Sequence, residues 1–291
     1  MLYLAGAIIF SSWLIIAFKI AERFGLSTFQ AIIFNYFTCV ITGILLEGKL
    51  PVVTDVVKAP WFMWAVLMGL MFVSVFNLVA YTTRKSGVAI ASVANKLSLV
   101  IPFLFSVYLY QEKISFLKIA GVLVALLAVF FTCIPSTSSK NDRGFKWNLF
   151  LLPLLLFAGS GLIDTLIKYV EFNFIKASNH NIYIITAFSV AGLAGIILFA
   201  GLLIRGKERF DVRAIIAGVL IGMPNYFSLW CLVHVLKMYE GNSSAIIPIT
   251  NMGIVLFSTL VAALFFKERL SKINLIGIIL SVIAISIIAF G

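Results

Sequence analysis

The chain has 291 residues, of which 62% are hydrophobic and only 11% charged, and its mean hydropathy is +1.13. Soluble globular proteins have roughly a quarter of their residues charged, so this chain has too few charges to cover a surface that faces water. The composition argues against a soluble enzyme, a nucleic-acid-binding protein and a disordered chain. A transmembrane barrel is also disfavoured, because barrel strands alternate apolar and polar residues, whereas the apolar runs here are continuous.

Ten apolar segments reach the length of about 20 residues that a membrane-spanning helix needs. The spans that the sequence predicts are 2–22, 29–46, 61–83, 88–110, 115–134, 148–169, 181–204, 212–236, 244–266 and 272–290. The longest polar stretch, residues 135–146, falls between the fifth and sixth spans. We therefore expect a first five-helix repeat over 1–134, a linker loop over 135–146 and a second five-helix repeat over 147–291.

The two halves carry the same polar residues at constant offsets. Ser11, Lys19 and Glu22 in the first half match Ser160, Lys168 and Glu171, and Asn95, Glu112, Ser115 and Gly121 match Asn251, Glu268, Ser271 and Gly277. Because five is odd, the second half enters the membrane upside down relative to the first. The predicted fold class is therefore an all-α membrane protein with ten transmembrane helices as two inverted five-helix repeats. Inverted repeats are typical of secondary transporters, whose binding sites lie near the bilayer midplane.

This layout resembles the EamA-like branch of the drug/metabolite transporter superfamily. The likeness rests on the five-plus-five arrangement, on the Glu-basic-hydrophobic-Ser loop after spans four and nine, and on the glycine in the following span. The resemblance covers almost the whole chain. It implies that spans one to four and six to nine surround a central cavity, with spans five and ten at the periphery. It also implies carriage of a small metabolite or drug-like solute, and we expect a multi-pass protein of the plasma (inner) membrane.

Lys96 is the most informative residue, because it lies only about 4 Å from the middle of span four at 1.5 Å rise per residue. Ionisable side chains inside a membrane are costly and usually functional. Lys96 could contact an anionic group of a solute, or it could be a coupling site whose pKa burial lowers. The alternative is a structural lysine that binds a backbone carbonyl or reaches a water-filled cavity with no role.

Four asparagines fall within about 6 Å of the middle of their spans: Asn35, Asn95, Asn225 and Asn251. They could form a ring of amide donors and acceptors around a solute. The alternative is interhelical hydrogen bonding, worth around 0.6 kcal/mol each. For the repeat partners Asn95 and Asn251, with Lys96 beside them, we favour the cavity. Tyr81 and Trp230 are secondary candidates for substrate contact, although an aromatic residue in a span more often packs or anchors at the interface.

Charged residues near the span ends are candidates for coupling or gating. Asp164 lies about 9 Å from the middle of span six, where it could couple transport to protons or act as a gate. Its alternative is a helix-end carboxylate near Lys168. The pairs Lys19 with Glu22 and Lys168 with Glu171 could form gates, since inverted repeats move against each other in alternating access, or they could simply extend to the interface.

Enzymatic chemistry has little support in the sequence. The histidines His180 and His234 lie in different segments without a ligand motif, the three cysteines have no paired spacing, and no Walker A loop is present. We therefore expect no catalytic residue, metal or cofactor. The expected partners are a small-molecule solute, with an anionic solute as one option, and the lipid bilayer, but no nucleic acid. The oligomeric state stays open.

Two lines of reasoning disagree on membrane orientation. The loops after odd-numbered spans carry 14 Lys and Arg, and those after even-numbered spans carry 7. The positive-inside rule then places both termini outside, whereas the family resemblance favours termini inside. For function, the sequence favours a secondary transporter of a small polar or amphipathic metabolite, working by alternating access and with proton coupling as an option. The alternative is a non-transporting membrane subunit or scaffold.

Overall fold

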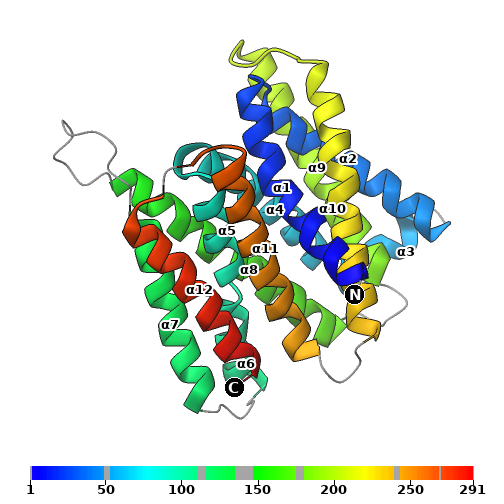
Figure 1. The fold of residues 1–291 in the computed structure, drawn as a ribbon. Coiled ribbons are helices and arrows are strands. Elements are labelled where there is room, and N and C mark those ends of the chain that lie inside the picture. Colours follow the sequence, from blue (N-terminus) through cyan, green and yellow to red (C-terminus); the bar gives the residue numbers. More distant parts are fainter. Residues whose placement is uncertain are drawn as a thin grey trace. The chain divides into compact units, whose positions relative to one another are not determined.

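The structure is a computed structural model, and it describes residues 2–48, 53–110, 116–134, 147–174, 180–238, 243–268 and 270–290. All the regular elements in these ranges are helices (Figure 1). The helices are α1 Leu2–Arg23, α2 Thr28–Glu47, α3 Val53–Lys58, α4 Phe62–Ser86, α5 Val88–Leu97, α6 Val100–Tyr110, α7 Phe116–Cys133, α8 Trp147–Phe174, α9 His180–Ile204, α10 Arg213–Met238, α11 Ser243–Leu264 and α12 Lys272–Phe290. The expected linker at 135–146 and the loop that contains Glu112 lie outside the described residues.

Within the described ranges, eight helical segments are long and apolar enough to cross a membrane. Two further apolar segments, Ile249–Leu264 and Lys272–Ile288, are shorter. The structure thus agrees with an all-helical, multi-pass architecture and with the predicted positions of the segments. It differs in span four, which the sequence predicts as one helix over 88–110 and which the structure divides into α5 and α6. The short helix α3 was not predicted.

The chain forms two compact units that do not coincide with the two halves of the sequence. The first unit contains residues 1–19, 78–162 and 227–291, and the second contains 20–77 and 163–226. Each unit therefore takes segments from both halves. The boundaries fall inside four helices, namely α1, α4, α8 and α10.

In the second unit, α2 packs closely against α9 and α10 because small residues line these contacts. A Cβ added at Gly222 of α10 would lie 2.7 Å from the backbone oxygen of Asn35. A Cβ at Gly195 of α9 would lie 2.7 Å from Cγ1 of Ile33. Without a hydrophobic driving force between helices in lipid, close contact of this kind is what holds membrane helices together. Gly218 and Gly222, which form a G-x-x-x-G pattern, both face α2.

In the first unit, α7 and α12 lie side by side along their lengths (Figure 1). The buried Asn274 joins the start of α12 to the end of α7. Its amide nitrogen donates to the backbone oxygens of Phe131, Thr132 and Ile134 at 3.3, 3.0 and 2.8 Å. Its side-chain oxygen accepts from the Ser271 hydroxyl at 2.6 Å. Asn274 therefore satisfies carbonyls at the end of α7 that the helix itself leaves without donors.

We expect Asn274→Ala to lower the free energy of unfolding by about 1–3 kcal/mol, because it leaves buried carbonyls without a donor. The measurement is thermal denaturation of the purified protein in detergent. Asn173→Ala is the matched control, since the exposed Asn173 donates only to Tyr169 of its own helix. Equal melting temperatures for Asn274→Ala and the control would contradict the role given to Asn274.

Candidate functional site

The fourth span is interrupted at Ser98 and Leu99, between α5 and α6. Pro102 explains the interruption, because proline has no N–H to donate to the carbonyl four residues earlier and its ring clashes with that carbonyl. The Ser98 oxygen instead accepts from the Ile101 N–H at 2.9 Å. The Ser98 hydroxyl donates to the backbone oxygen of Asn95 at 2.5 Å. The break therefore keeps its backbone groups satisfied by a short turn and by one side chain.

Lys96 lies in the last turn of α5, directly before this break, and is half-buried. The carbonyl end of a helix carries partial negative charge, which stabilises a nearby cation by about 0.3–1 kcal/mol at exposed sites. Lys96 is therefore close in sequence to the carbonyl end of α5, within a span. Interrupted helices are where secondary transporters form their binding sites, because unwound backbone and half-helix ends can then contact the solute.

Asn95 connects the same turn of α5 to α8. Its amide nitrogen donates to the hydroxyl of Ser160 at 2.9 Å. Gly161 packs against Ile101 of α6, and a Cβ at Gly161 would overlap that side chain. The adjacent pair of Ser160 and Gly161 thus holds α8 against both sides of the break. Asn95 itself is half-buried.

On its other side α5 contacts α11, where the Ser258 hydroxyl donates to the Ser92 hydroxyl at 2.6 Å. The end of α11 leads to the start of α5, since Glu268 hydrogen-bonds Val88, so the two helices run antiparallel. Asn251 precedes Ser258 by seven residues, which is two helical turns, and therefore shares its face. Seven residues along α5 from Ser92 is Leu99. The register thus puts the half-buried Asn251 level with the break in span four.

The other two candidate asparagines lie together in the second unit. The Asn225 amide nitrogen of α10 donates to Oδ1 of Asn35 on α2 at 3.0 Å, and both side chains are at least 96% buried. The Cys39 thiol donates to the same Asn35 oxygen at 3.7 Å and to the Gly222 backbone oxygen at 3.4 Å. The Asn35 nitrogen has no hydrogen-bond partner among the described residues. This arrangement matches the interhelical alternative, with one amide donor left over.

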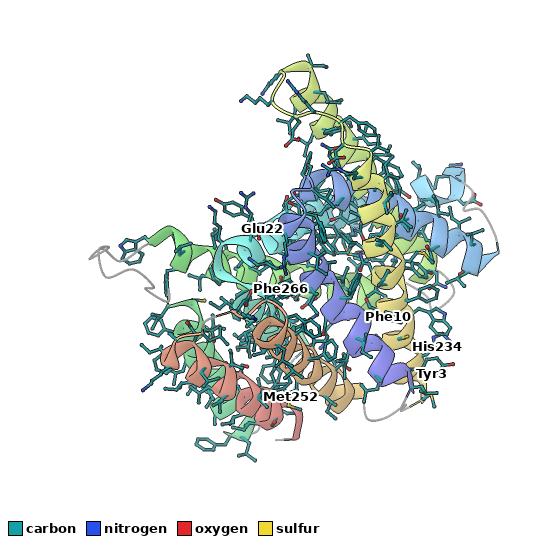
Figure 2. All side chains as sticks on the ribbon, turned by 45° about the horizontal axis from the view of Figure 1, so that its top comes forward. Tyr3, Phe10, Glu22, His234, Met252 and Phe266 are labelled. Atoms are coloured by element: carbon teal, nitrogen blue, oxygen red, sulfur yellow. The ribbon has the colours of Figure 1, made fainter. Side chains whose placement is uncertain are left out.

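The two aromatic candidates occupy different settings in the first unit. Tyr81 on α4 is 48% exposed, and the Lys85 ammonium lies 5.9 Å from its ring centre. Trp230 on α10 packs edge-on against Tyr3 of α1, with ring centres 5.5 Å apart, and lies 3.9 Å from the ring of His234. Tyr3 and His234 are seen next to each other near the start of α1 (Figure 2). Trp230 therefore belongs to an aromatic cluster.

The candidate coupling and gate residues lie on α1 and α8. Asp164 and Lys168 are exposed and belong to the part of α8 in the second unit. Glu171 is on the same helix, but its side chain lies outside the described residues. Lys19 and Glu22 are half-buried near the end of α1. Among the described residues, no group of three or more His, Cys, Asp or Glu could hold a metal ion.

Glu268, in the loop after α11, caps the start of α5. Its Oε1 accepts from the Val88 N–H at 2.8 Å, and its Oε2 from the Ala89 N–H at 3.4 Å. Burial raises the pKa of this carboxyl above its usual 4.5, while the two amides and the nearby charge of Lys19 act in the opposite direction. The structure shows that Glu268 holds the helix that carries Lys96.

Comparison with known proteins agrees with these features. Residues 1–134 match the model of the EamA-like transporter family. The N-terminal part of the chain is therefore similar to that family. This match confirms the resemblance inferred from the sequence over these residues, and the apolar helices agree with an integral, multi-pass membrane protein.

Similar proteins include two that match the chain over nearly its full length, beyond residues 1–134. An uncharacterised protein of Haemophilus influenzae is 29% identical over 286 residues, which is 96% of this chain and 94% of the relative. A protein of known crystal structure superimposes with a TM-score of 0.61 at 17% identity, covering 98% of this chain and 94% of that one. The second likeness concerns the fold alone.

Sequence reasoning missed three parts of the site that the structure brings together. The break itself was missed, although Pro102 signalled it, because a proline cannot donate to the carbonyl four residues earlier in a helix. Ser92 and Ser258 were missed because serine is common in membrane helices, and neither position has a serine partner at the repeat offset of 156 residues. The capping role of Glu268 was missed because it depends on a contact between residues 180 apart in the chain.

Glu268 should make stability depend on pH. Because its pKa is raised in the folded protein, the neutral acid is favoured there, and its contribution to stability is lost as the pH rises through that raised pKa. We expect the melting temperature of the wild type, relative to non-titrating Glu268→Gln, to rise as the pH is lowered from 7 toward about 4.5. Differential scanning fluorimetry in detergent measures this. A difference that is constant over that range would contradict the assignment.

Proposed function

We propose that this protein is a secondary transporter that moves a small polar or amphipathic metabolite across the plasma (inner) membrane by alternating access. Asn95, Lys96 and Asn251 would contact the solute. The observation that carries this proposal is the interruption of span four directly after Lys96, with Asn251 level with it on the neighbouring helix. The match of residues 1–134 to a transporter family supports the same conclusion.

Contacts within the first unit support the inverted-repeat organisation. A Cβ at Gly121 would lie 2.8 Å from Cγ1 of Ile288, and a Cβ at Gly277 would lie 2.7 Å from the Thr132 nitrogen. Adding the repeat offset of 156 to Gly121 gives Gly277, and adding it to Thr132 gives Ile288. The offset therefore relates the contact of Gly121 with Ile288 to the contact of Gly277 with Thr132. A self-complementary contact between α7 and α12 is what a two-fold axis in the membrane plane would generate.

Lys96 suggests the chemical class of the solute. An ammonium next to a helix break attracts a carboxylate, phosphate or other anionic group, while the amides of Asn95 and Asn251 can both donate and accept hydrogen bonds. The proposed solute is therefore a small metabolite with an anionic group. Tyr81 and Trp230, which belong to the same unit as Lys96, remain candidates for further contacts to it.

The movement of the solute would be coupled and gated by charged side chains. Asp164 is the proposed proton-coupling residue, because a carboxylate on a membrane helix can take up and release a proton during the cycle. Lys19 with Glu22, and Lys168 with Glu171, are the proposed gate pairs. In this arrangement Lys19 also attracts Glu268, so its charge is shared between α1 and the loop after α11.

We expect Lys96→Ala and Lys96→Met to reduce transport at least about tenfold, because the loss of one charge-assisted contact costs roughly 1.5–3 kcal/mol. Lys96→Arg should retain part of the activity. Candidate solutes come from a thermal-shift screen of the wild-type protein against a metabolite library, and uptake of the hits is then measured in proteoliposomes. The matched control is Lys207→Ala, which removes an exposed loop cation. Wild-type uptake by Lys96→Met would refute the site. The absence of any stabilising solute would favour a scaffold.

An inverted repeat requires equivalent loops to lie on opposite sides of the membrane. We expect single cysteines at Lys58, before span three, and Lys207, before span eight, to react with a membrane-impermeant maleimide from opposite sides. The native cysteines Cys39, Cys133 and Cys231 are buried, which keeps the background low. Labelling of the Lys207 position from the cytoplasm would agree with the loop charges, and labelling from outside with the family resemblance. Reaction of both positions from the same side would contradict inversion.

A further inference from the structure

The helix that carries Lys96 cannot hold its own position. Helix α5 has only ten residues, and helices this short are marginal without outside contacts. Its first backbone N–H groups have no partners within the helix. Its N-cap residue, Gly87, has no side chain with which to cap them. The start of α5 therefore depends on a group from elsewhere in the chain.

Glu268 is that group, and the local backbone is shaped to receive it. The carboxylate accepts hydrogen bonds from the N–H groups of Val88 and Ala89. A carboxyl group retains oxygen acceptors for these bonds whether it is ionised or neutral. Gly87 has φ +100°, which other residues rarely adopt, and a Cβ there would lie 2.7 Å from the Glu268 Oε2. Glycine is thus required at this position by both the backbone angle and the space that Glu268 occupies.

The cap joins the two helices on which the proposed site depends. Glu268 follows α11, which carries Asn251, and it binds the start of α5, which carries Lys96. Lys96 is eight residues from Val88, or about 12 Å along the helix axis. A change of tilt or rotation at the capped end is therefore transmitted to the ammonium, because the helix between them has no interruption.

We propose that Glu268 is a positioning residue: by capping α5 from the loop after α11, it fixes the distance between Lys96 and Asn251. The importance of this distance for solute binding rests on the function proposed above. The cap acts in the absence of any solute, so it can be tested separately. When the cap is lost, the first turns of α5 fray and the Lys96 ammonium becomes more accessible, while α7 and α12 stay as they are.

The test is hydrogen–deuterium exchange of the full-length protein in detergent, read by mass spectrometry. Glu268→Ala should raise the exchange rate of amides in residues 88–95 about fivefold, the size expected when a typical helix cap is removed. Exchange in α7 and α12 should not change, whereas a merely structural role would loosen the whole unit. Glu268→Gln keeps one acceptor oxygen and should rescue part of the effect. The matched control is Glu47→Ala, whose carboxylate accepts only a side-chain bond from Asn181.

A second probe reports on Lys96 itself. The rate at which N-hydroxysulfosuccinimide acetate acetylates Lys96, measured by peptide mass spectrometry, should rise in Glu268→Ala by at least about threefold. Gly87→Ala should reproduce both effects without removing the carboxylate, because it displaces Glu268 from the amides. This second variant keeps the test decisive if Glu268→Ala does not fold.

The outcomes separate this inference from the proposed function. Unchanged exchange of α5 in both Glu268→Ala and Gly87→Ala would overturn the positioning role, whatever the Lys96 variants do in transport. Uniformly increased exchange across the first unit would overturn it as well, in favour of a general structural role. Wild-type transport by Lys96→Met would instead overturn the proposed site, while the capping result would stand.

Discussion

The need to satisfy every backbone N–H and C=O inside a membrane constrains this structure more than any other factor. Hydrocarbon offers no hydrogen bonds, so a span that departs from the helix must find partners within the protein. Span four departs from regular helix at Ser98 and Leu99. There the Ser98 hydroxyl donates a hydrogen bond to the Asn95 backbone oxygen, and the Ile101 N–H donates to the Ser98 backbone oxygen. The break is tolerated because these partners are present, and it begins two residues after Lys96.

Side chains meet the same constraint by pairing across helices. Ser92 with Ser258 and Asn95 with Ser160 bind α5 on two sides, and Asn274 closes the end of α7. Each such bond contributes little in a bilayer, about 0.6 kcal/mol on average. These hydrogen bonds matter because they are directional. A hydrogen bond fixes the rotation of a helix about its axis, which apolar packing alone would leave adjustable. Rotation decides whether Asn95 and Lys96 face a solute or the lipid.

The sequence predicted the positions of the helices well, since hydropathy over about 20 residues is a strong signal. It also identified Lys96 as unusual, because a cation in an apolar run is visible without any structure. The prediction from sequence failed where the role of one residue depends on contact with a residue elsewhere in the chain. The effect of Pro102 on Ser98 was not predicted, and the contact of Glu268 with Val88 joins residues that no local pattern connects. The contact of Asn274 with α7 was likewise not predicted, because an asparagine near the start of a helix usually indicates only a cap of that helix.

The two proposed repeats also differ in ways that matter for chemistry. The residue equivalent to Lys96 at the offset of 156 is Met252, and the residue equivalent to Pro102 is Ser258. Accordingly α11 continues as one helix from Ser243 to Leu264, whereas span four is interrupted. Span four thus carries a cation and a break that α11 lacks. A solute bound between them would find its electrostatic contact on α5 and an uncharged amide on α11. In the proposed site an anionic solute would therefore bind in one orientation, although the two halves are proposed to be related by a repeat.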